Sequence, residues 1–213
     1  MIERIKTRKK TDIAKFYDKK YSKGGYFSEQ TFNTRALLIL NIKRDKNKRL
    51  LDVACGQGTL LAEAEKYMQT YGVDISKQAI EKAKKIAKQT VFKISAGEKL
   101  PFKDGFFDYI ACMGSLEHFV DMDSALKEMK RVLKVDGKVL IHVPNSVYLV
   151  HKILRINTQG QINERLATEE EWISVLDEYF NVDKVEKYNT RWYFYWIPKK
   201  YCCHFTFLCS KKK

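Results

Sequence analysis

The chain has 213 residues, 45% of them hydrophobic and 31% charged, a composition typical of one soluble globular domain with a sizeable core. Its longest apolar runs, residues 36–40 and 192–198, are far too short to cross a bilayer, and its charged start lacks the apolar segment of a secretory signal. We therefore expect a cytoplasmic protein with no membrane span. The five cysteines lack the spacing of zinc ligands, so we expect reduced thiols and no metal site.

The formal net charge of +14 raises the question of an anionic partner such as RNA or a membrane surface. Most of the lysines, however, alternate with acidic residues or fall on the expected solvent side of helices. A solvated surface explains the charge about as well as a binding face does. A nucleic-acid partner therefore stays open but is not favoured.

Residues 1–42 precede the first expected core strand and are predicted to form two helices. Apolar residues recur at helical spacing in both, and Gly24-Gly25 separates them. The segment could be a helical layer packed on the sheet edge, or a lid that closes over a ligand with the glycine pair as its hinge. In the second case Tyr21 and Tyr26 would contact the bound ligand.

The stretch Leu50–Leu61 reads as a short buried strand, a sharp turn through Gly56 and Gly58, and the start of a helix. Such a turn exposes backbone N–H groups and the positive end of a helix to a ligand. About twenty residues later a second strand ends at Asp74, where an acid can accept both hydroxyls of a ribose. Together the two strand ends predict a nucleoside site.

Strands and helices alternate after Leu50, which predicts a mostly parallel sheet with right-handed crossovers and helices on both faces. A helix that opens at the capping box of residues 168–171, and strands near 181–188 and 204–210, complete the expected order. The earlier elements are expected at 50–54 (strand), 58–68 (helix), 70–73 (strand), 76–88 (helix), 91–94 (strand), 107–112 (strand), 122–134 (helix) and 138–143 (strand).

Two stretches, residues 145–166 and 190–201, fit no part of this core. Both adjoin the expected carboxyl edge of the sheet, where open α/β sheets bind ligands. The second is crowded with aromatic residues. We interpret both as substrate-cap insertions, so that residues 1–213 form one domain with an N-terminal helical lid at 1–42.

Six motifs in one order carry a family resemblance. They are Asp52-Val-Ala-Cys-Gly-Gln-Gly58, Gly72-Val-Asp-Ile-Ser76, Glu98-Lys-Leu-Pro-Phe102, Phe107-Asp-Tyr109, Ser115-Leu-Glu-His-Phe119 and Arg131-Val-Leu-Lys-Val-Asp-Gly137. This order resembles the class I S-adenosylmethionine (SAM)-dependent methyltransferases, in particular the type 11 group that includes the ubiquinone and menaquinone biosynthesis enzymes. The resemblance implies a Rossmann-like, seven-stranded, mostly parallel sheet whose last strand is antiparallel, with SAM as cofactor and S-adenosylhomocysteine as product.

The resemblance also implies roles for individual residues. Asp52 would order the loop and approach the methionine amine, Gly56 and Gly58 would let the backbone approach the ligand, and Asp74 would hold the ribose. The remaining cofactor-binding residues implied are Ala54, Cys55, Ile75, Gly97, Glu98 and Met113, together with Tyr21 and Tyr26 of the lid. Ala96 replaces the acid with which many relatives hold the adenine amine, which leaves that task to Ser95, Glu98 or the backbone near Gly97.

The chemistry implied is displacement of a methyl group from a sulfonium by an oxygen, nitrogen or carbon nucleophile. Because the leaving group is already activated, the protein mainly aligns two reactants and excludes water. A base helps where the nucleophile is a hydroxyl, and His118, after the fourth strand, is the catalytic candidate. Alternatively, Glu117-His118 only orients the loop.

The aromatic cap segments favour a small, partly apolar acceptor. We expect the protein to be a monomer or a homodimer. An RNA or protein methyltransferase and a non-catalytic SAM-binding partner subunit remain as alternatives. The spacing Tyr148-x-x-x-Lys152 matches a short-chain dehydrogenase pair, but the glycine loop lacks the third glycine and no serine partner stands at the usual distance. We interpret that spacing as chance.

Overall fold

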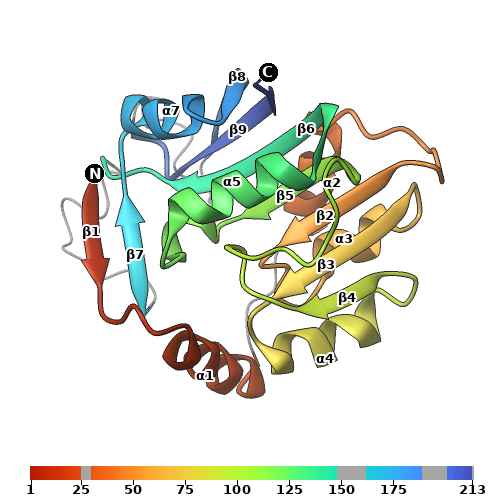
Figure 1. Ribbon diagram of the computed structural model, residues 1–213, viewed down its shortest axis with the longest axis horizontal. Helices are drawn as coiled ribbons and strands as arrows, with labels where there is room; N and C mark the ends of the chain where they lie inside the picture. The colour runs from red at the N-terminus through yellow and green to blue at the C-terminus, as the bar shows by residue number, and fades with distance from the viewer. Residues whose placement is uncertain (25–29, 148–161, 189–200, 213) are drawn as a thin grey trace.

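The computed structural model describes residues 1–24, 30–147, 162–188 and 201–212. These residues form a seven-stranded sheet of order β4-β3-β2-β5-β6-β9-β8 with helices packed against it (Figure 1). Every neighbouring pair is parallel except those of β9, which runs antiparallel to both β6 and β8. The predicted fold class is thereby confirmed. The strands are β2 (Arg49–Val53), β3 (Gln69–Asp74), β4 (Val91–Ile94), β5 (Phe107–Met113), β6 (Leu133–Pro144), β8 (Phe180–Tyr188) and β9 (His204–Lys211).

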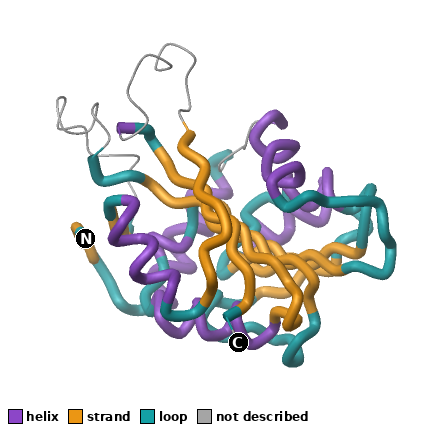
Figure 2. Tube along the Cα trace, turned by 90° about the horizontal axis from the view of Figure 1, so that it is seen from above, coloured by secondary structure: helices purple, strands orange, loops and turns teal. Residues whose placement is uncertain are grey.

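Helices cover both faces of this sheet (Figure 2). Successive residues of the central strands point to opposite faces, so that Leu50 packs in one core cluster and Leu51 in the other. The first cluster also contains side chains of α2 (Gln30–Ile39), α3 (Thr59–Ala64) and α4 (Lys77–Ile86), and the second those of α5 (Met122–Val132) and α7 (Glu169–Asp177). Continuous burial on both faces explains why these strands read as unbroken apolar runs.

Most predicted boundaries hold within a few residues, but one helix is shorter and one strand longer than expected. The helix expected at 58–68 ends at Ala64, because the amides of Tyr67 and Met68 both donate to the Ala64 carbonyl in a turn that leads into β3. Strand β6 starts at Leu133 rather than 138, where Leu133 already pairs with Phe107 ahead of a register shift. The capping box at Thr168 is present as predicted.

The N-terminal segment differs from the two helices expected there. Its helices are α1 (Lys10–Ser22) and α2, but strand β1 (Ile2–Ile5) precedes them and pairs antiparallel with β7 (Asn163–Leu166). No local pattern revealed β1, because its partner strand lies some 160 residues further along the chain. The ribbon places α1 on the side of the sheet toward which the carboxyl ends of β2 and β3 point (Figure 1).

Among the described residues, no helix is both long and apolar enough to cross a membrane. The aromatic part of the cap segment expected at 190–201 lies outside the described residues, as does most of the segment at 145–166. The described end of the latter contains β7.

Candidate active site

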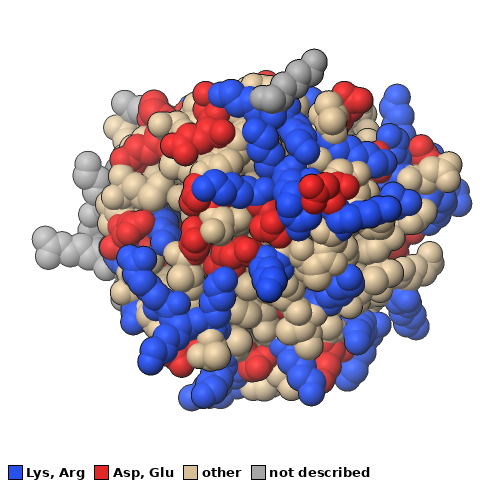
Figure 3. All heavy atoms as spheres, viewed as in Figure 1, with Lys and Arg blue, Asp and Glu red and all other residues tan. Residues whose placement is uncertain are grey.

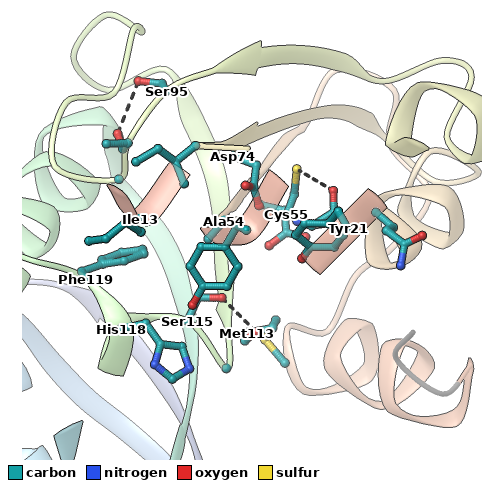
Figure 4. A pocket seen from close by; sticks show the side chains of 18 of the residues that line it. Ile13, Tyr21, Ala54, Cys55, Asp74, Ser95, Met113, Ser115, His118 and Phe119 are labelled. Atoms are coloured by element: carbon teal, nitrogen blue, oxygen red, sulfur yellow. Dashed lines mark hydrogen bonds between the residues drawn. The ribbon is translucent and has the colours of Figure 1, made fainter. Parts of the chain in front are cut away.

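A cavity of about 300 Å³ lies at the carboxyl ends of β2, β3 and β5, under helix α1. Loops that follow β2, β3, β4 and β5 form its floor, and α1 and α2 contribute side chains from the other side (Figure 4). Its size falls at the small end of the range typical of ligand sites. Predicted site residues that line it are Tyr21, Asp52, Ala54, Cys55, Gly56, Asp74, Ile75, Gly97, Glu98, Met113 and His118.

The loop after β2 bends through three residues with positive φ, namely Ala54, Gly56 and Gly58. Gly56 lines the cavity, and a Cβ there would lie 2.6 Å from the hydroxyl of Tyr21. Gly58 does not line the cavity. A Cβ there would lie 3.0 Å from the Ala83 side chain, so this glycine allows the loop to pack against α4.

Asp74 ends β3 and connects the two strand ends. Its Oδ2 accepts from the Gly56 amide at 2.9 Å, and its Oδ1 accepts from the Ser76 amide at 2.8 Å. Burial raises the pKa of this carboxyl to about 6, although both backbone hydrogen bonds favour the ionised form. The charge that Asp74 carries at neutral pH is therefore held in a water-poor cavity, where hydroxyl donors would stabilise it.

Asp52, near the end of β2, is 4% exposed and lines the same cavity. Its Oδ1 is buried without a hydrogen-bond partner among the described residues. Burial, and then the neighbouring Asp74, raise the pKa of this carboxyl well above its ordinary value. An unsatisfied buried carboxyl oxygen is costly, so a cationic or N–H donor in the cavity would be bound favourably and would in turn favour the ionised form of Asp52.

The polar side chains of the loop after β4 form hydrogen bonds and an ion pair with other parts of the chain. The Ser95 hydroxyl donates to the Lys99 carbonyl at 2.6 Å. Glu98 accepts from the Val120 amide at 3.2 Å and pairs with Lys10 of α1 at 3.6 Å. Ser95, Glu98 and the backbone at Gly97 nevertheless all border the cavity, where an adenine was expected.

His118 ends the short 3₁₀ helix η1 (Leu116–His118) and lines the cavity near Met113 and Ser115 (Figure 4). Its Nδ1 lies 2.5 Å from the backbone oxygen of Asn163 in β7. Because a carbonyl can only accept, this contact assigns the ring proton to Nδ1 and leaves a lone pair on Nε2.

The partly buried His118 and the adjacent buried Glu117 are both uncharged near pH 7. Burial lowers the pKa of His118 to about 4 and raises the pKa of the adjacent Glu117 to about 8. The 3.6 Å contact between His118 Nε2 and Glu117 Oε1 is thus a contact of two uncharged groups rather than an ion pair. An unprotonated imidazole of this kind can accept a proton.

Several residues of the cavity wall were not predicted as site residues. Ile13 and Tyr17 come from α1, Phe32 and Asn33 from α2, and Phe119 from the segment after η1. Ile13, Tyr17 and Tyr21 recur every four residues and so lie on one face of the helix. A helix that only packs on a core has the same spacing, so the sequence pattern does not distinguish the two roles. Tyr26, the other predicted lid contact, lies outside the described residues.

All five cysteines are buried, and none of them forms a disulfide. In the described part of the chain, no group of three or more His, Cys, Asp or Glu side chains is arranged to hold a metal ion.

A mostly parallel sheet whose adjacent strand ends carry a glycine turn and an acid is typical of a Rossmann-like domain. Residues 51–141 match the family model described as "Methyltransferase domain". Over this stretch the chain is similar to the type 11 methyltransferase domains that the motifs indicated.

Two named relatives cover part of the chain. An uncharacterized methyltransferase, YcgJ of Bacillus subtilis, is 31% identical over 145 residues, which are 62% of this chain and 57% of that protein. The ubiquinone/menaquinone biosynthesis C-methyltransferase UbiE of Geotalea uraniireducens is 32% identical over 117 residues, half of each chain. The chain thus spans about half the length of these relatives.

Solved structures share the fold over a larger part of the chain. The PH0226 protein of Pyrococcus horikoshii superposes with a TM-score of 0.68 at 24% identity, over 87% of this chain and 93% of that one. The [4+2]-cyclase SpnF superposes with a TM-score of 0.72 at 16% identity, over 97% of this chain and 98% of that one. Because a protein named as a cyclase shares this fold, the fold alone does not specify the reaction.

Proposed function

We propose that this chain binds SAM in the cavity under α1 and transfers its methyl group to a small-molecule acceptor. The observation that carries the proposal is the pair of buried carboxyl groups at adjacent strand ends, Asp52 with an unsatisfied oxygen and Asp74 with its charge facing the cavity. These groups suit the two polar ends of the cofactor, Asp74 the ribose hydroxyls and Asp52 the methionine amine. When bound, the cofactor supplies an activated methyl group.

The chain's own residues would then align and shield the reactants. Tyr17, Tyr21 and Ile13 of α1 cover the cavity, which limits access of water. On the side near Met113 the cavity is lined by Phe32, whose ring packs against His142, the β6 partner of Met113, and by the uncharged His118. This lining favours an uncharged, partly apolar acceptor. Relatives named for quinone biosynthesis support the same class of acceptor.

His118 would act as the base where the acceptor is a hydroxyl. Its proton is fixed on Nδ1 by the Asn163 carbonyl, which leaves Nε2 to accept the proton that the acceptor loses. Burial lowers the pKa of His118 to about 4, so the imidazole is unprotonated at neutral pH but is a weaker base than an ordinary histidine. The reaction would take place in the cytoplasm, where buried thiols such as those of this chain stay reduced.

An RNA substrate is a second candidate because of the +14 charge. On the face shown in Figure 3, however, basic and acidic side chains intermingle rather than forming a single basic stripe. Many lysines and arginines pair with acids, as Lys48 and Lys134 do with Asp108. Dispersed and partly paired charge engages few phosphates at once.

The test is calorimetry with S-adenosylhomocysteine, followed by incorporation of label from methyl-tritiated SAM into bulk RNA and into a small-molecule extract. We expect one-to-one binding, label in the small-molecule fraction, and RNA binding that disappears by physiological salt. A protein with about 6–10 phosphate contacts loses roughly 10³–10⁵ in affinity between about 50 and 200 mM salt. RNA binding that is tight at low salt and weakens this steeply, together with label in the RNA fraction, would instead favour an RNA substrate.

A further inference from the structure

Helix α1 contacts the start of α4 through a half-buried acid, Asp18, which does not line the cavity. Its Oδ1 accepts from the Ser76 hydroxyl at 2.6 Å and from the Gln78 amide at 3.1 Å. Both donors belong to the start of α4, which follows β3 directly. Asp18 therefore caps α4 from a different helix.

Ser76 connects this contact to the cavity. It is fully buried, and its own hydroxyl accepts from the Ala79 amide as the N-cap of α4. Its amide donates to Oδ1 of Asp74. A single serine thus contacts the carboxylate of α1 through its side chain and the carboxylate of the cavity through its backbone.

The end of α1 is held to the same elements. Lys82 of α4 donates to the Tyr21 carbonyl and, at 3.2 Å, to the Gly24 carbonyl. Gln57 of the glycine loop also donates to the Gly24 carbonyl at 3.2 Å. Tyr17 and Tyr21, which flank Asp18 along the helix, cover the cavity. The contacts that dock α1 on α4 and the glycine loop therefore also place Tyr17 and Tyr21 over the cavity.

We propose that Asp18 is a positioning residue that couples the docking of α1 to the orientation of Asp74, so that the covering helix and the cofactor stabilise each other. The proposal rests on the proposed function, because Asp74 is there the acceptor of the ribose hydroxyls. Coupling of this kind is reciprocal: a ligand on Asp74 favours the docked helix, and the docked helix favours the ligand. Loss of Asp18 removes two hydrogen bonds to its carboxyl oxygen, and the Ser76 hydroxyl and Gln78 amide at the start of α4 then lack this acceptor.

The experiment compares Asp18→Ala, Asp18→Asn and the matched control Asp12→Ala. Asp12 is exposed on the same helix and carries the same charge, but its side-chain contact is with Thr7 and not with α4. Each variant is examined by thermal unfolding, by hydrogen exchange of α1 with and without S-adenosylhomocysteine, and by calorimetry with that ligand.

We expect α1 to exchange faster in Asp18→Ala even without ligand, and S-adenosylhomocysteine to bind roughly tenfold more weakly, the effect of about one strong hydrogen bond. Asp18→Asn retains an acceptor oxygen and should recover affinity to within about threefold of the wild type. Asp12→Ala should resemble the wild type in both measurements. Unchanged exchange and affinity in Asp18→Ala, or equal losses in Asp12→Ala, would overturn the proposal.

Failure of this proposal is distinguishable from failure of the proposed function. A wild-type chain that does not bind S-adenosylhomocysteine contradicts the proposed function. Normal binding by the wild type together with unchanged behaviour of Asp18→Ala contradicts only the role of Asp18.

Discussion

The two ends of the cavity are built in different ways. At the end with Asp52 and Asp74, two hydrogen-bonded parallel strands, β2 and β3, present their carboxyl ends side by side. At the end with His118, the ring comes from η1 and its backbone partner Asn163 from β7, 45 residues away along the chain. One end is a product of local sequence order, and the other depends on segments that meet only after folding.

We expect the two ends of the cavity to have different roles, the Asp52 and Asp74 end in cofactor binding and the His118 end in the reaction. The strand ends belong to the sheet core, where Leu50, Leu51 and Val53 are fully buried, so the acids at Asp52 and Asp74 are rigidly held. The other end combines η1, the β1–β7 ribbon and helix α1, and it contains the neutral His118 and Glu117. We therefore expect substitutions at the first end to change cofactor affinity and those at the second end to change rate or stability.

The largest effect is expected at His118. His118→Ala should lower the rate of methyl transfer to a hydroxyl acceptor by roughly 10²–10⁴-fold, the usual contribution of a general base. His118→Asn is the matched control, because its amide can still donate to the Asn163 carbonyl but offers no basic nitrogen. Both variants should transfer label slowly while binding S-adenosylhomocysteine normally by calorimetry. Wild-type rates in His118→Asn would show that the ring serves only to orient the loop.

Asp74 tests the other end. Asp74→Ala should weaken S-adenosylhomocysteine binding by roughly 2–4 kcal/mol, because two ribose hydroxyls lose a charged acceptor. Asp74→Asn, which keeps one acceptor oxygen, should bind with intermediate affinity. Since Asp74 also holds the Gly56 and Ser76 amides, thermal unfolding must show that each variant is folded at the assay temperature. Unchanged affinity in a folded Asp74→Ala would contradict the cofactor site.

Glu117 should give the smallest effect, and the effect is on stability rather than binding. Its pKa is raised by burial to about 8, so the folded state keeps a proton that the unfolded state has lost above about pH 4.5. The wild type should therefore lose stability as pH rises toward 8, by up to about 1.4 kcal/mol per pH unit. Glu117→Gln should remove this slope, as measured by denaturant unfolding at pH 6 and pH 8. Equal slopes in both proteins would mean that Glu117 is ionised in the fold.

Much of the fold was predictable because its determinants are local. Apolar runs, the Gly56 turn and the capping box at Thr168 each specify one element, and parallel order follows from their alternation. The acid at Asp74 was predictable for the same reason, since the end of a strand fixes its position at the sheet edge.

The missing parts are those that depend on distant partners. Strand β1 is too short and too charged to be recognised without β7, and nothing near His118 in the sequence indicates the Asn163 carbonyl. Likewise, Asp18 reads as one more solvent-facing acid of a lysine-rich helix until α4 is in place. Periodicity identifies an element, whereas its contacts are set by tertiary packing.

The position of β9 has a consequence for synthesis on the ribosome. This strand, residues 204–211, is inserted between β6 and β8 and pairs with both. Until it leaves the ribosomal exit tunnel, the edge of β6 around Leu140 and Ile141 has no antiparallel partner, while the rest of the parallel sheet can already assemble. An open apolar strand edge is prone to pair with other chains. Nascent chains stalled before residue 204 should accordingly depend on chaperones much more than chains in which β9 has paired.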